Sequence, residues 1–593
     1  MMNPVYYCYS IRKRDIHEMK TITGYLKPYI GRMILGFIVK VLGTFMDLGL
    51  PWVLAYIIDE VIPQNSYRLI ALWGVVMLLL AVGARVFNVK ANQMASKVGR
   101  DTIVTIRHDL FVRIQNLSGR QLDYFGIPSL ISRMSTDTYN IHSTIGRLQR
   151  LGVRAPIILI GGIIITFTME PVLTLILLAC LPIIGCGIWL ISRKGLPMYQ
   201  ALQKKIDAMV RVVRENITGV RVIKALSKND YERRRFQTVN QEVCGQEFRA
   251  GRTMGAMNPM MNMVLNGALT VMIVIGAYRV NAGHTEVGTI MAFLSYFTMI
   301  LNAVMSINRI FIDLSKSTAS ASRIREVLNT PFDQPVREIP REDSPYHIEF
   351  RDVSFSYNPH DEAEEVPDCL SHISFALKKG ESLGIIGSTG CGKTTLINLL
   401  MRFYDVDQGD VLIEGRNVQN FQMAEMRKRF GVVFQNDVLF ADTIFENINF
   451  GRGLNREEVR PAAEYAQALP FIEKLSAGFD SEVAAMGTNF SGGQKQRMLI
   501  SRALAAHPEI LILDDSSSAL DYKTDASLRK ALREHFASTT SIIVAQRISS
   551  IYQCDHVMVL ENGQCVGYGT HEELMRDCEI YREIHESQMR AEA

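Results

Sequence analysis

The sequence predicts an α-helical membrane domain of six spans followed by an α/β domain, and two observations carry this prediction. Uncharged or nearly uncharged apolar stretches are concentrated in the first half of the 593-residue chain, and they reach the length of about 20 residues that crosses a bilayer as a helix. The second half holds strand patterns around a glycine-rich loop. At this length, one compact domain is not expected.

Composition narrows the functional classes. The formal net charge of +4 is small for the length, so the overall electrostatics give no support to a nucleic-acid partner. Nine cysteines are irregularly spaced and form no CxxC pair. This pattern suggests neither a disulfide framework nor a zinc site.

Six apolar stretches are expected to span the membrane. They cover residues 33–58, 69–87, 155–169, 171–191, 260–280 and 288–312. Only Glu170 separates the third stretch from the fourth, which predicts a tight hairpin. Six spans place both ends of the membrane domain on the same side.

The distribution of Lys and Arg predicts the orientation. Segments 88–154 and 192–257 are basic, whereas the short connections on the other side hold only Arg68 as a positive charge. Basic segments face the cytoplasm. We therefore expect a multi-pass protein of the cell (plasma) membrane with both termini and the second domain in the cytoplasm. The stretch "IRKRDIHEMK" (11–20) is expected to form a cytoplasmic lead-in helix.

Both basic segments are too long for simple loops, and apolar residues recur in them at helical spacing, as in 103–117. The membrane helices are therefore expected to continue into the cytoplasm. Glycine and proline interrupt the segments near 124–133 and 219–230, where short helices are expected to cross the hairpin tips. The basic "ERRRF" (232–236) fits either a solvated cytoplasmic face or a contact with anionic lipid.

Composition also predicts the domain boundaries. Residues 1–328 are assigned to the membrane domain, and the proline-containing stretch 329–347 is assigned to a linker. The second domain is expected to cover 348–593, beginning with the alternating strand pattern "HIEFRDVSFSY".

A phosphate-binding loop opens the second domain. "ESLGIIGSTGCGKTTLINLLMRFY" has the pattern of a strand, a glycine loop and a helix, and it matches GxxxxGK[ST] from Gly387 to Thr394. Glycines let backbone amides close around phosphates, Lys393 adds a positive charge, and Thr394 offers a hydroxyl to Mg²⁺. The residues expected to bind the nucleotide here are Gly387, Ser388, Thr389, Gly390, Cys391 through its backbone, Gly392, Lys393, Thr394 and Thr395.

Two further motifs follow the loop. "EILILD" has the composition of a buried parallel strand that delivers Asp514 to its carboxyl edge beside the phosphate loop, where it fits a water-mediated Mg²⁺ ligand. In "NFSGGQKQRMLISRAL" (489–504), small residues precede a helix. Its free amides and dipole fit a phosphate, and the same pattern also fits a simple helix cap.

Taken together, these motifs resemble the ATP-binding cassette family over essentially the whole chain. "GSTGCGKTT" is similar to Walker A, "ILILD" to Walker B, and "FSGGQ" (490–494) to the family signature, with Phe490 in the usual Leu place. "VVFQND" resembles the Q loop, in which Gln435 is the metal and coupling residue. "SALD" (518–521) resembles the D loop, which contains Asp521, and Tyr357 resembles the aromatic residue that stacks on adenine.

Six spans followed by one cassette are similar to an exporter half-transporter of the type IV fold. The resemblance implies ATP and Mg²⁺ as cofactors, with the metal held by Thr394, Gln435 and, through water, Asp514. "YFGIPSLISR" and "GVRVIKALSKND" resemble its two coupling helices, although the first lacks the glycine usually found where Ser129 falls.

The resemblance further implies that two cassettes close head to tail, so that each ATP lies between the Walker motifs of one and the signature of the other. Ser491, Gly492, Gly493 and Gln494 would then contact ATP bound by the partner. Two positions of this chain depart from the family pattern. Asp515 replaces the glutamate that orients the attacking water, and Gln546 replaces the switch histidine.

Both departures affect catalysis. Asp515 lacks one methylene, about 1.5 Å of reach, and a displacement of about 1 Å can cost roughly 100-fold in rate. Gln546 offers an amide but not the charge of an imidazolium. The pattern resembles the degenerate-site subunit of a bacterial heterodimeric multidrug-type exporter. Such an ATPase is active as part of a dimer, and the ATP site of this chain is expected to hydrolyse poorly.

The expected partner is a second half-transporter with the consensus glutamate and histidine. A homodimeric exporter and an ATP-gated regulatory membrane protein stay as alternatives. "SEVAAMG" (481–487) carries Ala485 where the family has a second acid, so the contact with the coupling helices is expected to differ.

The transported substrate is expected to be hydrophobic or amphipathic: a drug, a lipid or a peptide. Lys40 and Asp47 lie seven residues apart in the first span, which fits either pathway lining or structural pairing. The fifth span opens with "MGAMNPMMNMV", whose polarizable side chains fit either varied apolar molecules or ordinary helix packing.

Overall fold

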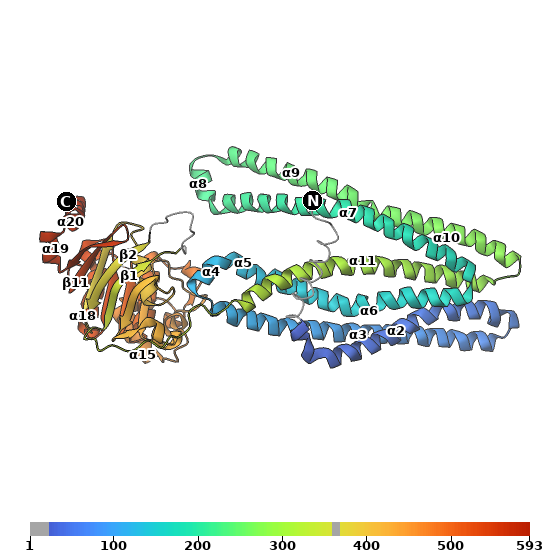
Figure 1. Cartoon of the computed structure of the whole chain (residues 1–593), viewed down its shortest axis with the longest axis horizontal. Coiled ribbons are helices and arrows are strands. Elements are labelled where there is room, and N and C mark those ends of the chain that lie inside the picture. Colours follow the sequence, from blue (N-terminus) through green and yellow to red (C-terminus); the bar gives the residue numbers. More distant parts are fainter. Residues whose placement is uncertain (1–22, 358–367, 517, 593) are drawn as a thin grey trace. The chain divides into compact units, whose positions relative to one another are not determined.

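The structure, a computed structural model, describes residues 23–357, 368–516 and 518–592. The lead-in helix expected over 11–20 lies outside these residues. The chain folds as two compact units (Figure 1). One contains the chain up to residue 115 together with 128–330, and the other contains 116–127 together with the chain from 331 onwards.

Long helices build the first unit. Within the described residues, six helical stretches are long and apolar enough to cross a membrane, which confirms the predicted six-span domain. The helices are α2 (Ile30–Tyr56), α3 (Tyr67–Gln115), α5 (Ile127–Ser132), α6 (Thr138–Met169), α7 (Pro171–Thr218), α8 (Val220–Ala225), α9 (Asn229–Gly255), α10 (Met257–Asn281) and α11 (Val287–Asn329).

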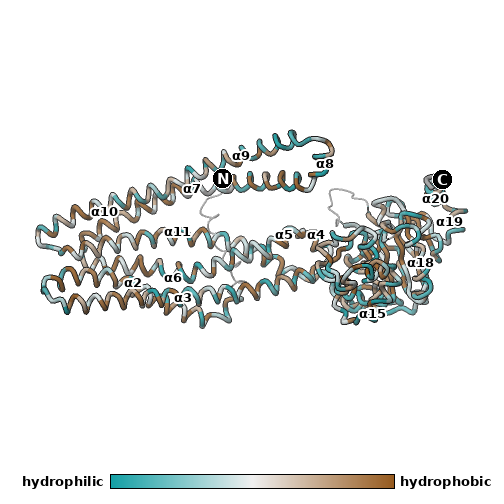
Figure 2. The backbone as a smooth tube through the Cα atoms, turned by 180° about the vertical axis from the view of Figure 1, so that it is seen from behind, coloured by the Kyte–Doolittle hydropathy of each residue, from teal (hydrophilic) through white to brown (hydrophobic). Residues whose placement is uncertain are grey.

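The helices of this unit run well beyond the apolar stretches. Figure 2 shows hydrophobic residues along α10 and α2 and hydrophilic residues around α8. Helices α7 and α9 lie side by side and are joined through α8, so the basic segment 192–257 is a helical hairpin. The short helix α8 lies within the predicted hairpin tip at 219–230.

Glu170 forms the tight turn between α6 and α7. Its backbone is extended, and Pro171 follows as the first residue of α7, a position where the missing N–H costs nothing. The Glu170 side chain is buried, pairs with Arg279 at 3.0 Å and accepts a hydrogen bond from the Thr285 hydroxyl at 2.8 Å. These contacts tie the α6–α7 turn to the α10–α11 turn.

Two main sheets organise the second unit. An antiparallel sheet has the order β2-β1-β4-β5, and a larger sheet has the order β12-β11-β3-β10-β9-β6. In the larger sheet β11, β3, β10, β9 and β6 are parallel, and β12 is antiparallel to β11. The strands are β1 (Ile348–Phe355), β2 (Leu370–Leu377), β3 (Ser382–Gly387), β4 (Gln408–Ile413), β5 (Arg416–Asn417), β6 (Phe430–Val433), β7 (Asp442–Thr443), β8 (Glu482–Val483), β9 (Ile510–Asp514), β10 (Thr540–Val544), β11 (His556–Glu561) and β12 (Gln564–Gly569).

Helices cover these sheets, and buried aliphatic and aromatic residues fill the space between them. This α/β unit after six spans confirms the predicted fold class. The helices of the unit are α4 (Gly119–Phe125), α12 (Lys393–Leu400), α13 (Met423–Arg427), α14 (Ile444–Asn449), α15 (Arg456–Tyr465), α16 (Leu469–Ile472), α17 (Gly492–Leu504), α18 (Tyr522–His535), α19 (His571–Asp577) and α20 (Glu579–Glu592).

Helix α4 groups with the second unit, whereas the predicted boundary placed it in the first domain. The Gly119 amide donates to the Phe403 carbonyl at 3.1 Å, and the Tyr404 hydroxyl donates to Asp123 at 2.6 Å. A Cβ at Gly119 would lie 2.6 Å from the Tyr404 ring, so only glycine allows this approach. Ser118 and Gln121 form a capping box that starts the helix.

Candidate nucleotide-binding site

The phosphate loop lies between the end of β3 and the start of α12. Gly390 and Gly392 have φ values of 87° and 101°, in the left-handed region that favours glycine. A Cβ at Gly392 would lie 2.5 Å from Leu370 and 2.9 Å from the Cys369 carbonyl. The loop can therefore close in front of α12, whose free amides and dipole suit an anionic phosphate.

Lys393 is folded back onto the loop. Its ammonium group donates to the carbonyls of Gly387 at 2.9 Å and Ser388 at 2.7 Å. Its Nζ also lies 3.6 Å from Cys391 Sγ, and the Cys391 side chain is buried. The positive charge is thus held where phosphates would enter.

Thr394 and Asp514 meet behind the loop. The Thr394 hydroxyl donates to Asp514 Oδ2 at 3.0 Å. Asp514 is buried, and burial raises the pKa of its carboxyl, whereas the Thr394 bond and the Lys393 charge lower that pKa. With the Gln435 amide in the same cavity, these oxygens suit Mg²⁺, which prefers hard oxygen ligands.

Asp515 and Gln546, the two positions that depart from the family pattern, contact each other. The Gln546 side-chain amide donates to Asp515 Oδ2 at 2.8 Å. Asp515 has a φ of 50° and donates its backbone N–H to the Val544 carbonyl at 3.0 Å. Burial raises the pKa of the Asp515 carboxyl, opposed by the Gln546 bond and by the charges of Lys393 and Arg547.

One cavity of 290 Å³ joins these groups. Among the described residues that line it, ten were singled out from the sequence or follow directly from its motifs, and Cys369 and Val544 were not. Cys369 belongs to no motif and directly precedes β2, whereas Val544 ends β10, two positions before Gln546. The lining residues are Cys369, Thr389, Gly390, Gly392, Lys393, Thr394, Thr395, Gln435, Asp514, Asp515, Val544 and Gln546.

Tyr357, expected to stack on adenine, lies beside the cavity rather than in its lining. Its hydroxyl is 3.1 Å from Thr395 Oγ1, and its ring packs edge-on against Phe355 and Tyr404. The residue is 39% exposed. An exposed aromatic ring beside the phosphate loop can stack on a base.

The signature residues start α17 and lie outside that lining. Ser491 is the N-cap: its hydroxyl accepts from the Gln494 amide at 3.3 Å, and its own amide donates to the Gln494 side chain at 2.9 Å. A Cβ at Gly493 would lie 3.0 Å from the Ala519 carbonyl. Asp521 caps α18 through Thr524.

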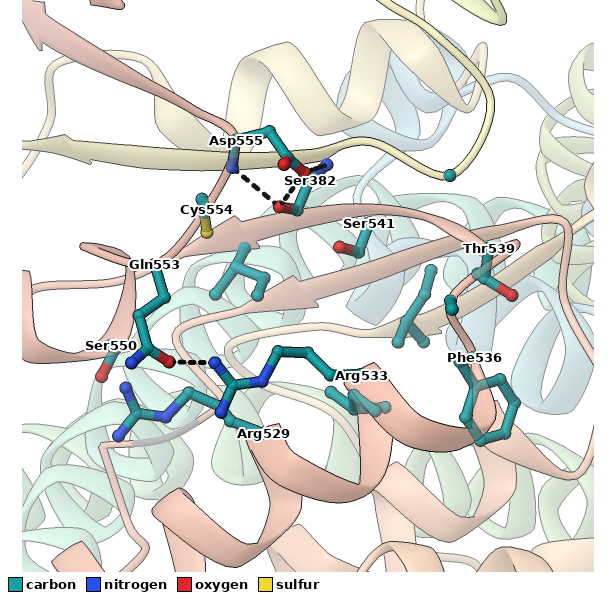
Figure 3. Close-up of a pocket in the computed structure, with 15 residues that line it drawn as sticks. Ser382, Arg529, Arg533, Phe536, Thr539, Ser541, Ser550, Gln553, Cys554 and Asp555 are labelled. Atoms are coloured by element: carbon teal, nitrogen blue, oxygen red, sulfur yellow. Dashed lines mark hydrogen bonds between the residues drawn. The ribbon is translucent and has the colours of Figure 1, made fainter. Parts of the chain in front are cut away.

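A second cavity of the same unit lies elsewhere, at the amino ends of β3 and β10 (Figure 3). Asp555 accepts hydrogen bonds from the amide and the hydroxyl of Ser382, and Arg533 donates to Gln553. Its lining contains none of the residues predicted to bind the nucleotide. The phosphate loop follows the opposite, carboxyl end of β3.

Lys40 and Asp47 join one polar network between α2, α3 and α6. Lys40 is buried and donates to Asn88 at 2.8 Å and to Asn92 at 3.2 Å. Asp47 accepts from Asn88 at 3.1 Å and pairs with Arg154 at 3.1 Å. Asn88 therefore bridges the two charges, and both have partners within this chain.

The comparisons with known proteins agree with this geometry. Residues 33–304 match the family model described as ABC transporter transmembrane region, and residues 370–518 match the one described as ABC transporter. The chain belongs to the ATP-binding cassette (ABC) transporter family. It is therefore a multi-pass membrane protein that carries a cassette.

Particular relatives cover nearly the whole chain. An uncharacterized ABC transporter ATP-binding protein of Mycobacterium tuberculosis, Rv1273c, is 34% identical over 95% of this chain and 97% of its own. YfiB of Bacillus subtilis, described in the same words, is 32% identical over 96% and 98%. The solved structure of a bacterial Atm1-family ABC exporter with ATP bound has a TM-score of 0.79 at 24% identity, over 94% and 98% of the chains, and shares the fold.

Proposed function

We propose that this chain is one subunit of a heterodimeric ATP-driven exporter and that its own Walker site binds ATP but hydrolyses it slowly. The hydrogen bond from Gln546 to Asp515 carries the proposal. Asp515, which follows the Walker B aspartate, has one methylene fewer than the family's glutamate, and its carboxylate already accepts a hydrogen bond from Gln546. It is thus poorly placed to orient an attacking water.

ATP and Mg²⁺ fit the residues present. The amides at the start of α12, the Lys393 charge and the Thr394–Asp514 pair offer a phosphate cradle beside hard oxygen ligands. Bound Mg²⁺ would neutralise phosphate charge. Gln435 lines the same cavity and would complete the ligand set.

The signature supports a shared site. Ser491, Gly492 and Gly493 keep the family sequence, and they lie outside the lining of this chain's own cavity. The amides of Gly492 and Gly493 lie in the first turn of a 13-residue helix, where backbone amides lack intrahelical partners, and they suit a phosphate presented by another cassette. The proposed partner therefore carries the consensus glutamate and histidine and receives this signature.

The proposed substrate is a hydrophobic or amphipathic molecule. Polarizable methionines open α10, and Met263 is 79% exposed there, which suits contact with varied apolar molecules. Lys40 and Asp47 have partners within the chain, which favours structural pairing over pathway lining for these two residues.

ATP turnover of purified protein tests the proposal. The lone chain is expected to turn over slowly, and co-purified heterodimer is expected to turn over quickly, because only the partner's Walker site is chemically complete. Equal turnover in the two preparations would show a homodimer with two equivalent sites. Nucleotide-dependent conformational change in the heterodimer without substrate flux in vesicles would instead show a regulatory membrane protein.

A further inference from the structure

A buried imidazole and two carboxylates meet at the amino ends of β1 and β9 and the carboxyl end of β4, away from the nucleotide cavity. His347 precedes β1, Glu414 lies in the β4–β5 turn, and Glu509 precedes β9. One donor atom of each side chain lies within 4.8 Å of the other two. His347 Nε2 is 4.0 Å from Glu414 Oε1.

The imidazole nitrogen that faces these carboxylates lacks a hydrogen-bond partner among the described residues. His347 is 2% exposed, and its Nε2 is buried. An unpaired buried polar atom is costly, so a native structure usually supplies it with a partner. Here the side chain is buried and its free nitrogen points toward two acids.

The other imidazole nitrogen is held. His347 Nδ1 lies 2.7 Å from Thr540 Oγ1, which also accepts the Gly380 amide at 3.0 Å and lies 3.4 Å from the Lys378 carbonyl. When Nδ1–H donates to Thr540, the Thr540 hydroxyl donates to Lys378. Nε2 then presents a lone pair, the arrangement usual for a metal-ligating histidine with an oriented outer partner.

The carboxylates keep free oxygens. Arg429 contacts Glu414 Oε2 at 3.1 Å and Glu509 Oε2 at 3.5 Å, which leaves Glu414 Oε1 facing His347. The two acids are 38% and 45% exposed, so their side chains can move. Zinc bonds of about 2.0–2.2 Å require contraction of the triangle by about 1 Å.

We propose that His347, Glu414 and Glu509 form a binding site for Zn²⁺ or a similar divalent transition-metal ion, completed by water. One imidazole with carboxylates suits such ions better than Mg²⁺ or Ca²⁺, which prefer all-oxygen sites. The ion would join the four-stranded sheet, through His347 and Glu414, to the six-stranded sheet at the start of β9. Metal binding would therefore stabilise the cassette unit.

The test uses the purified full-length chain, freed of metal by a chelator and kept without nucleotide. Zn²⁺ is titrated by calorimetry, and thermal unfolding is recorded with and without it. The parent is expected to bind one more Zn²⁺ ion than Glu414→Gln or Glu509→Gln, or to bind this ion at least about 10-fold more tightly. Zn²⁺ should raise the unfolding temperature of the parent but not of the two variants. Mg²⁺ at the same concentration should not compete.

A matched pair in the same unit gives the control. His556 Nε2 and Glu381 Oε2 lie 3.8 Å apart, and this pair belongs to no group of three possible metal ligands among the described residues. The variant Glu381→Gln should therefore bind Zn²⁺ like the parent. Arg429→Gln removes one of the competing cations and should tighten Zn²⁺ binding several-fold. The proposal would be overturned if the parent, Glu414→Gln and Glu509→Gln bound Zn²⁺ equally and were equally stabilised by it. It would also be overturned if the parent bound no Zn²⁺.

Discussion

Gln546 and Asp515 are joined by a hydrogen bond of 2.8 Å from the amide to the carboxylate. Considered one at a time, each residue is an isolated departure from the family pattern. In the structure the two residues complement each other, because the side-chain amide of Gln546 donates a hydrogen bond to the carboxylate of Asp515. The pair acts as one polar unit, and the predictions for the nucleotide site follow from it.

Restoring both positions should activate the lone chain. Asp515→Glu with Gln546→His replaces the mutually bonded pair by the consensus acid and switch residue, and the signature needed for a second site is already present. ATP turnover of the purified lone chain is expected to rise about 100-fold, the size of a 1 Å positional effect. The single changes should give less, and Lys393→Ala in the double variant should remove the gain. Unchanged turnover in a folded double variant that binds ATP would contradict the degenerate-site interpretation.

In the heterodimer, Ser491→Ala in the signature is expected to lower ATP turnover much more than Asp515→Asn. Ser491→Ala removes a hydroxyl proposed to face the productive site, and loss of one donor aimed at transition-state charge costs about 100-fold to 1000-fold in other enzymes. Asp515→Asn alters a site that contributes little turnover and should be mild. ATP turnover and substrate flux in membrane vesicles measure both.

Loss of helix capping needs its own control, since Ser491 also caps α17. Thr570 caps α19 with the same kind of capping box. Thr570→Ala should therefore lower the free energy of unfolding about as much as Ser491→Ala does through lost capping, by about 1 kcal/mol, and it should leave ATP turnover unchanged. Near-normal activity of Ser491→Ala beside collapse of Asp515→Asn would place hydrolysis at this chain's own Walker motifs.

Lys393→Ala should weaken nucleotide binding at this chain's own site. The phosphates lose a charged donor, and such hydrogen bonds contribute about 1.5–3 kcal/mol, or roughly 10-fold to 100-fold in affinity. Heterodimer hydrolysis should fall only in part, because the partner's pocket keeps its chemistry. Photolabelling of each subunit with an ATP analogue measures occupancy. Changing the partner's corresponding lysine should abolish hydrolysis, and equal effects of the two changes would contradict the division of labour.

Gly119→Ala should disturb α4. The new Cβ would lie 2.8 Å from the Phe403 carbonyl as well as close to the Tyr404 ring, and overpacking of this kind costs about 1–3 kcal/mol. ATP binding is expected to persist while the ratio of substrate flux to ATP hydrolysis falls. Gly245→Ala in α9, where a Cβ meets nothing within 4 Å, should leave that ratio unchanged. An unaltered ratio for Gly119→Ala would contradict a role of α4 in coupling ATP hydrolysis to transport.

Much of the architecture could be predicted from the sequence because its signals are local. Apolar length predicts the spans, and glycine spacing predicts the phosphate loop from Gly387 to Thr394. The start of α4 was missed although Ser118 and Gln121 carry the local signature of a capping box. In the structure, α5 lies within the predicted tip at 124–133, and α4 begins ahead of it.

The remaining features depend on long-range packing. Gln546 and Asp515 are 31 residues apart in sequence and meet only because β9 and β10 are adjacent parallel strands, with Asp514 opposite Val544. Cys369 reaches the cavity through the start of β2. No spacing rule connects such positions, so their contacts appear only in the folded sheets.

The capping box at Ser491 has a consequence for how a partner's ATP could be received. The Ser491 oxygen accepts the Gln494 amide, yet a hydroxyl can also donate its hydrogen. The same side chain can therefore hold the start of α17 and offer a donor to a phosphate at the same time. In a closed dimer of the proposed kind, the helix start needs no rearrangement before binding, so little affinity is lost to reorganisation. Such a surface is preorganised for another chain's nucleotide.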